Sequence, residues 1–184
     1  MTDLGSIRQA DVRPVETEMD KRVERDIARR IVRTIARELE DAGFRQTKPT
    51  FVIRPGDIVT PFFHFHKFTF GPYFRIHLGV RVMNDTFVPL ALNGPSHEHA
   101  GQYSEREEDI QHCVQVMATY CRAEGLPWLE RWSDPKELLA AKDTPLHPED
   151  REALSNTIAG RFNVQAIALS ESLLGLRSGK NTAT

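Results

Sequence analysis

Apolar side chains recur every three or four positions in the first part of the chain, which is the spacing of an amphipathic helix. Thr17 followed by Asp20 resembles a capping box at its start, and Gly43 supplies a left-handed cap at its end. The pattern therefore predicts one long helix between these caps. Its apolar stripe consists of Val23, Ile27, Ile31, Ile35, Leu39 and Ala42.

After Gly43 the pattern changes from helical spacing to alternation of apolar and polar positions, which predicts strands. Turn residues divide this part of the chain at Pro55-Gly56-Asp57, at Gly71-Pro72 and at Asn84-Asp85. The polar run 93–103 predicts a loop. The expected strands are 44–54, 58–70, 73–83 and 86–92.

Helical patterns return in the last part of the chain. Ser104 with Glu107 resembles a second capping box, and the helix that follows is expected to end at Gly125. Further helices are expected at 135–142, at 148–159 and over Val164–Leu174.

One helix, four strands and then several helices is not the alternating order of a parallel α/β protein. The order predicts an α+β fold, in which an antiparallel meander sheet of about four strands is covered by helices on one face. The length favours a single domain over residues 17–176, with flexible segments at 1–16 and 177–184.

Composition narrows the function classes only slightly. Apolar residues make up 40% of the chain and charged residues 27%, and the net charge is −2, so no overall field attracts nucleic acid or an anionic membrane. No apolar run resembles a signal peptide or a membrane span. Cys113 and Cys121 fall in one predicted helix about 12 Å apart, too far for a disulfide. These features favour a reducing, cytoplasmic location.

The two strands around Gly71-Pro72 give the most detailed local prediction. A turn centred there places Phe63 opposite Val80 and His66 opposite His77. One face of this hairpin is then apolar and must meet the core. The other face carries Phe62, His64, His66, Phe68 and Phe70 from one strand and Tyr73, Arg75, His77, Gly79 and Arg81 from the next.

That second face is a candidate recognition surface, because it is unusually aromatic for a face turned away from the core. Arginine adds planar donors suited to carboxylate or phosphate. Whether the C-terminal helices cover this face or leave it to a partner stays open at this point. The predicted binding residues are Phe68, Tyr73, Arg75, His77 and Arg81.

A metal site is the alternative for the same face. His64 and His66 point to one side of a strand, and His77 from the neighbouring strand completes three possible zinc ligands. His97 and His99 in the polar run are candidates for additional ligands or a base. However, no HExxH motif is present and no carboxylate falls on the hairpin face, so half-exposed sheet positions are the preferred interpretation of the three imidazoles. No catalytic residue is predicted.

Arginines also recur along the first predicted helix, opposite its apolar stripe. They are Arg22, Arg25, Arg29, Arg33 and Arg37. Such a row can bind nucleic-acid phosphates. Between Glu18 and Asp41, however, seven basic residues are matched by seven acidic ones, and Asp26 has the favourable spacing to pair with Arg30. A solvated, ion-paired face is the preferred interpretation, and nucleic acid is an unlikely partner.

The helix Val164–Leu174 is apolar on all sides, with Glu171 as its only charge. Such a helix is either fully buried or meets another chain. The sequence therefore leaves two alternatives open: the helix is buried within one chain, or it forms the contact of a homo-oligomer.

Several motifs together resemble an uncharacterised bacterial domain-of-unknown-function family. They are Ala42-Gly43-Phe44, the strand 74–80, Gly125-Leu126-Pro127-Trp128 and the pair Leu138-Leu139. The resemblance covers about residues 25–142 and implies a helix-plus-sheet fold. It implies no activity, cofactor or catalytic residue, because none is established for the family.

These observations favour a non-enzymatic binding or protein-interaction module, for example an immunity-type or accessory protein. Its partner would be a protein or a small ligand, and no interaction with a membrane is expected. The alternative is a metal-dependent hydrolase that uses the histidine cluster.

Overall fold

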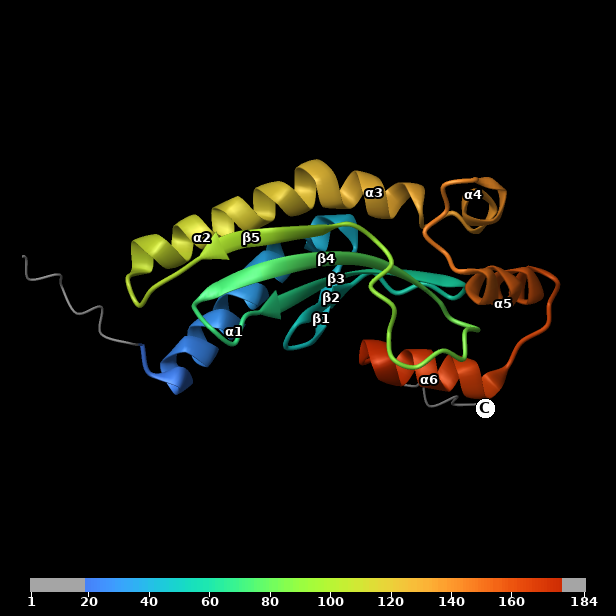
Figure 1. Ribbon diagram of the computed structural model, residues 1–184, viewed down its shortest axis with the longest axis horizontal. Helices are drawn as coiled ribbons and strands as arrows, with labels where there is room; N and C mark the ends of the chain where they lie inside the picture. The colour runs from blue at the N-terminus through green and yellow to red at the C-terminus, as the bar shows by residue number, and fades with distance from the viewer. Residues whose placement is uncertain (1–18, 177–184) are drawn as a thin grey trace, which may run out of the picture.

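The computed structural model describes residues 19–176, apart from the side chain of His99. The flexible segments expected at 1–16 and 177–184 lie outside the described residues. Figure 1 shows the arrangement of the helices and strands. In chain order they are α1 (Lys21–Glu38), the 3-10 turn η1 (Glu40–Ala42), β1 (Arg45–Lys48), β2 (Phe51–Ile53), β3 (Val59–Lys67), β4 (Tyr73–Val82), β5 (Ser96–Gln102), α2 (Glu107–Tyr120), the π-helical turn η2 (Cys121–Gly125), α3 (Leu126–Arg131), α4 (Pro135–Ala140), α5 (Pro148–Ile158) and α6 (Val164–Leu174).

The fold is α+β, as the order of patterns predicted. Five strands form one antiparallel sheet in the order β1-β2-β3-β4-β5, with one helix before it and several after it. Helices α1 and α2 cover one face, which we call the helical face, while α6 lies against one end of the opposite, outer face. No helix in residues 19–176 is long and apolar enough to cross a membrane.

The first helix begins and ends close to the predicted residues. Asp20, and not Thr17, is its N-cap, and the carboxylate accepts backbone N–H bonds from Arg22 and Val23. After η1 the chain turns at Gly43, whose φ of 79° is the left-handed conformation that glycine adopts most easily.

The strands differ from the prediction at two places. The segment 44–54 splits into β1 and β2, which pair with each other, and the expected strand 86–92 is irregular. Instead, β5 lies in the run predicted as a loop. Pro89 has no N–H for a ladder, and the Asn93 side chain bonds both backbone groups of Val80 in place of a strand.

The predicted helix end at Gly125 is wrong, because α2, η2 and α3 follow one another without a break. Gly125 has ordinary right-handed helical angles and is buried. A Cβ placed there would lie 2.5 Å from Cε1 of Phe63. The glycine therefore allows this helical segment to approach the sheet closely, which is a packing role and not a capping one.

The main core lies between the helical face and the helices α1, α2 and α3. Residues from all these elements are fully enclosed there, including Ile31, Ile35, Phe63, Leu78 and Met117. A smaller apolar cluster on the outer face joins α6 to the sheet. It consists of Ile53, Phe62, Met83 and Leu174.

Candidate binding surface on the outer sheet face

The pairing of β3 with β4 decides which side chains share a face. His64 lies opposite His77, and His66 lies opposite Arg75, so the predicted pairing of His66 with His77 is wrong by two residues. The pairing extends to Phe68 and Tyr73, and the turn occupies the four residues between them. Because side chains alternate with a period of two, a shift of two residues leaves every side chain on its predicted face.

The three imidazoles accordingly gather on the outer face. The rings of His64 and His77 are stacked with centroids 5.8 Å apart, and His66 lies 6.1 Å from His64 and 6.4 Å from His77. Phe51 of β2 stacks on the other side of His64 at 4.5 Å. The outer face therefore carries a continuous row of aromatic and imidazole rings.

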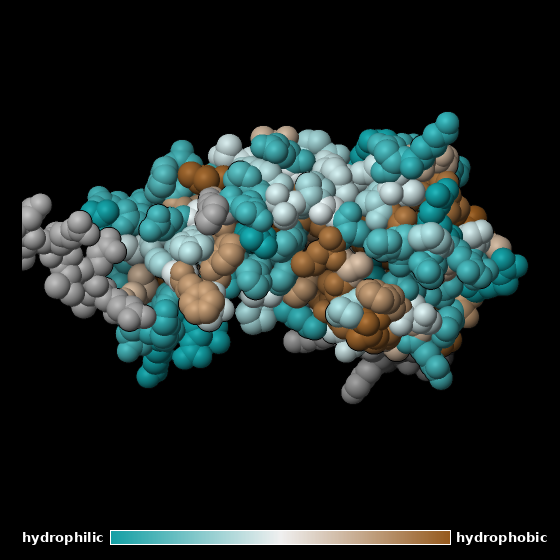
Figure 2. All heavy atoms as spheres, in the orientation of Figure 1, coloured by the Kyte–Doolittle hydropathy of each residue, from teal (hydrophilic) through white to brown (hydrophobic). Residues whose placement is uncertain are grey.

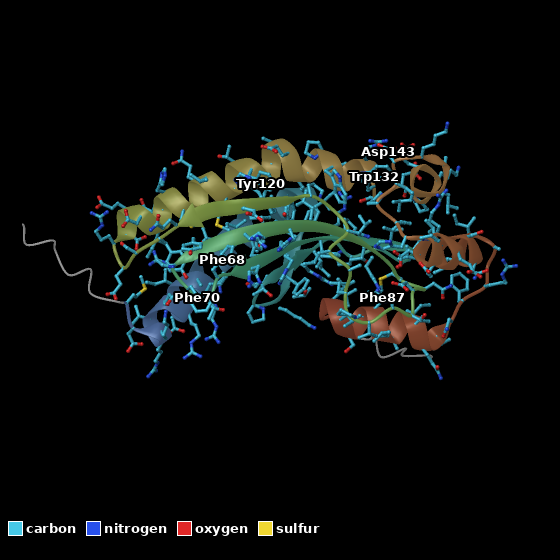
Figure 3. All side chains as sticks on the ribbon, viewed as in Figure 1. Phe68, Phe70, Phe87, Tyr120, Trp132 and Asp143 are labelled. Atoms are coloured by element: carbon cyan, nitrogen blue, oxygen red, sulfur yellow. The ribbon has the colours of Figure 1, made fainter. Side chains whose placement is uncertain are left out.

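Helix α6 covers only one end of this face, which answers the question that the sequence left open. Leu174 packs against Phe62 and Ile53, and the carbonyls at the end of α6 accept hydrogen bonds from the Thr47 hydroxyl and the Lys48 ammonium. Figure 3 shows Phe68 and Phe70 at the opposite end of the sheet from α6.

Arg81, one of the predicted binding residues, lies under the covered end and is only 2% exposed. Its guanidinium pairs with Asp85 at 2.5 Å, donates to the Ser170 hydroxyl of α6 at 2.9 Å and donates to the Asp85 carbonyl at 2.7 Å. The prediction of Arg81 as a surface residue is therefore corrected. The alternation along the strand predicted the face of Arg81 correctly, but it could not predict that α6 encloses the side chain.

The open end carries the remaining predicted residues, held by contacts with one another. The Arg75 guanidinium lies 5.0 Å from the Phe68 ring centroid and pairs with Glu98 of β5 at 2.9 Å. The Phe68 and Tyr73 rings are 4.9 Å apart, and the Tyr73 hydroxyl donates to the Phe70 carbonyl. We call Phe68, Phe70, Tyr73, Arg75 and His77 the open-end surface.

Burial keeps the inner imidazoles uncharged at neutral pH. The pKa of His64 is lowered to about 4, first by burial and then by the neighbouring His77 and His66. The pKa of His77 is also lowered, first by burial and then by the positive charge of Arg75. Arg75 is therefore the permanent cation of the open-end surface. The Nδ1 atom of His64 is buried without a hydrogen-bond partner among the described residues.

This unpaired nitrogen leads to a prediction for His64→Phe. Phenylalanine keeps the stacking and removes a buried polar atom, so we expect the free energy of unfolding to rise by about 1 kcal/mol at pH 7. The low pKa of His64 in the folded state means that its stability contribution is present above pH 6.5 and is lost as the pH falls toward 4. The variant should consequently lose less stability than the wild type across that window.

Urea unfolding at pH 7 and pH 5 measures both effects. His112→Gln, at an exposed position on α2, is the control and should change neither value by more than about 0.5 kcal/mol. An unchanged acid dependence in His64→Phe would contradict the assignment of the lowered pKa to this residue.

The histidine cluster does not form a ready metal centre. Within residues 19–176, no group of three or more His, Cys, Asp or Glu side chains is placed to hold a metal ion. His97, predicted as a possible additional ligand, is stacked on Tyr120 at 4.4 Å and so lies away from the cluster. The geometry of His64, His66 and His77 therefore gives no support to the zinc-dependent hydrolase.

Sequence reasoning missed two side chains of the outer face. Glu98 belongs to β5, a segment that was predicted to be a loop. No pattern in that polar run indicated that Glu98 pairs with Arg75. Phe51 fell inside a predicted strand of undivided length, so its face was not assigned. The Pro49-Thr50 pair that separates β1 from β2 was the available signal.

Comparison with known proteins adds no relative to this geometry: no family model, curated protein or solved structure matches the chain. The resemblance described under Sequence analysis stays a prediction based on its motifs.

Proposed function

We propose that this chain is a non-enzymatic protein-binding module whose binding site is the open-end surface. The observation that carries the proposal is Phe70, which is 88% exposed at the tip of the β3–β4 turn. Figure 2 shows a small, moderately hydrophobic patch at this end of the molecule, at the left of the view, with hydrophilic atoms around it, while a larger and more hydrophobic patch lies right of centre. An aromatic side chain held in water beside further rings is typical of an interaction site.

The surface is also ordered before any partner arrives. Arg75 is held between Phe68 and Glu98, and the Tyr73 hydroxyl anchors the turn that presents Phe70. Tyrosine, phenylalanine and arginine are enriched at protein interfaces. Side chains that are already fixed lose less conformational entropy on binding, which favours affinity.

The chemistry of the surface indicates the kind of partner. Phe70 borders a hollow of about 930 Å³ that can receive an apolar side chain. Arg75 can exchange its exposed partner Glu98 for a carboxylate of the bound protein. We therefore propose a protein partner that presents an acidic side chain next to an apolar one. The hollow is lined by Met19, Lys21, Glu24, Thr69, Phe70, Gly71, Pro72, Gln102, Tyr103 and Ser104.

The test compares Phe70→Ser with Phe162→Ser as baits in an extract of the source cells. Phe162 is also well exposed, at 61%, but it lies between α5 and α6. The proposal predicts that a protein captured by the wild type is lost at least about tenfold with Phe70→Ser, because a central aromatic anchor contributes about 2 kcal/mol or more. Phe162→Ser should capture it normally.

Arg75→Gln is the second test variant and should weaken capture of the same protein, since it removes the permanent cation. Thermal unfolding of each variant checks that the fold is intact. Equal capture by Phe70→Ser and the wild type would show that the partner, if any, binds elsewhere.

A further inference from the structure

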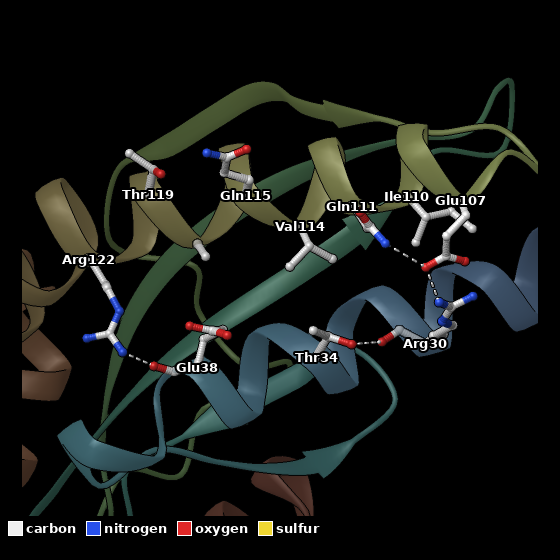
Figure 4. Close-up of a pocket in the computed structure, with 11 residues that line it drawn as sticks. Arg30, Thr34, Glu38, Glu107, Ile110, Gln111, Val114, Gln115, Thr119 and Arg122 are labelled. Atoms are coloured by element: carbon white, nitrogen blue, oxygen red, sulfur yellow. Dashed lines mark hydrogen bonds and ion pairs between the residues drawn. The ribbon is translucent and has the colours of Figure 1, made fainter.

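The ion pairs along α1 have other partners than the sequence predicted. This changes the interpretation of the arginines on this helix. Arg30 does not pair with Asp26 but reaches across to Glu107 of α2 at 2.5 Å. Asp26 lies near Arg29 instead, at 3.4 Å. Figure 4 shows Arg30 turned toward α2, where it closes one end of a groove between the two helices.

Two acidic side chains near the row are also occupied, whereas Glu38 and Glu40 at the end of the helix are exposed. Glu24 is turned into the protein, only 2% exposed, and pairs with Lys67 of β3 and Lys21. Asp41, beyond the end of α1, pairs with Arg122. From position 25 to 37, α1 contains five arginines and a single carboxylate, Asp26.

Four of these arginines form one exposed row, which we call the arginine face: Arg25, Arg29, Arg33 and Arg37. Among residues 19–176, neither Arg33 nor Arg37 has an ion pair. Four residues of helix rise about 6 Å, so the row presents a cation at about that interval over about 18 Å. Duplex DNA carries a phosphate about every 3.4 Å along each strand, so a row of this length spans several phosphates.

A hollow beside the row has the size and the donors for a phosphate group. Arg29 and Arg33 line a space of about 280 Å³ between α1 and the β1–β2 turn, together with Gln46 and Lys48. The planar guanidinium suits two-point contact with phosphate oxygens. No exposed aromatic residue lies on α1, so the stacking on which single-strand binding relies is missing from this face.

We propose that the arginine face binds the sugar-phosphate backbone of double-stranded nucleic acid without reading its sequence. The whole chain has a net charge of −2, so such binding depends on the local row and not on the overall field. The arginine face and the open-end surface belong to opposite sides of the sheet. This inference does not depend on the protein-binding proposal.

Fluorescence anisotropy with a labelled duplex of about 20 base pairs tests the proposal. The wild type should bind at about 25 mM salt, with the logarithm of the binding constant falling by about 3 for each tenfold rise in salt, as expected for three to four phosphate contacts. Arg33→Gln combined with Arg37→Gln should lower the affinity at least about tenfold and reduce that slope by about 2.

The matched control is Arg106→Gln combined with Arg131→Gln, which removes the same charge from exposed positions elsewhere. It should bind the duplex within about twofold of the wild type. No binding at about 25 mM salt, an equal loss in the control, or binding of anionic phospholipid vesicles without binding of the duplex would each overturn the proposal.

Discussion

Arg81→Met is expected to lower the free energy of unfolding by about 3–5 kcal/mol at pH 7. Arg81 is the cation of a buried network in which Asp85 is its direct partner and Asp150 of α5 lies close by. Methionine fills the space of the aliphatic stem but leaves the carboxylates without a counter-charge. Removing one member of a buried ion pair costs more than the pair itself contributes, because the other charge remains desolvated.

The network also predicts how this loss varies with pH. Burial, and then the neighbouring Asp85, raise the pKa of Asp150. A carboxyl group with a raised pKa in the folded state favours folding fully below pH 3.8, and this contribution is lost as the pH rises through the raised value. The cost of Arg81→Met should consequently shrink toward pH 4, where Asp150 takes up a proton.

Urea unfolding at pH 7 and pH 4.5 measures the cost and its pH dependence. Adding Asp150→Asn to Arg81→Met should restore at least about 1 kcal/mol at pH 7, because it removes one unpaired charge. Arg131→Met, which breaks exposed ion pairs with Glu137 and Asp143, is the control and should cost less than about 1 kcal/mol. A small and pH-independent loss in Arg81→Met would contradict the buried network.

Phe63→Ala is expected to cost about 3–5 kcal/mol as well, for a different reason. The Phe63 ring is fully buried on the helical face and packs against Phe44, with ring centroids 5.2 Å apart, and against Phe65 at 6.2 Å. It also meets Gly125, where the helical segment approaches the sheet closely. Alanine would leave a cavity that these neighbours cannot fill.

Phe70→Ala is the matched control, because this phenylalanine follows the same strand but is mostly exposed. It should change the free energy of unfolding by no more than about 0.5 kcal/mol. Chemical denaturation of both variants at pH 7 separates the two roles. Similar losses in the two variants would mean that Phe70 is a structural residue, and the open-end surface would lose its main binding residue.

The two faces of the β3–β4 hairpin could be predicted because they depend only on alternation. A register error of two residues moved His66 from its place opposite His77 but changed no face. The exact partners could not be predicted, because they depend on a turn whose length is set by pairing of Phe68 with Tyr73. For the same reason the histidine cluster was predictable while its inner geometry was not.

Long-range contacts account for the other differences. Strand β5 has no alternating apolar pattern, since it is an edge strand of mostly polar residues that pairs with β4 after an irregular segment. The enclosure of Arg81 depends on Ser170, 89 residues later in the chain. The ion pair between Arg30 and Glu107 spans 77 residues. Local spacing carries no information about partners at such separations.

Contacts between aromatic ring protons in a nuclear Overhauser spectrum test the central claim most directly, namely that the imidazoles share the outer face. The structure predicts contacts of His77 with His64 and of His64 with Phe51. Contacts of the His77 ring with Phe63 or Phe65 would place that imidazole on the helical face. The open-end surface would then not exist as described, and the proposal that it binds a protein would be wrong.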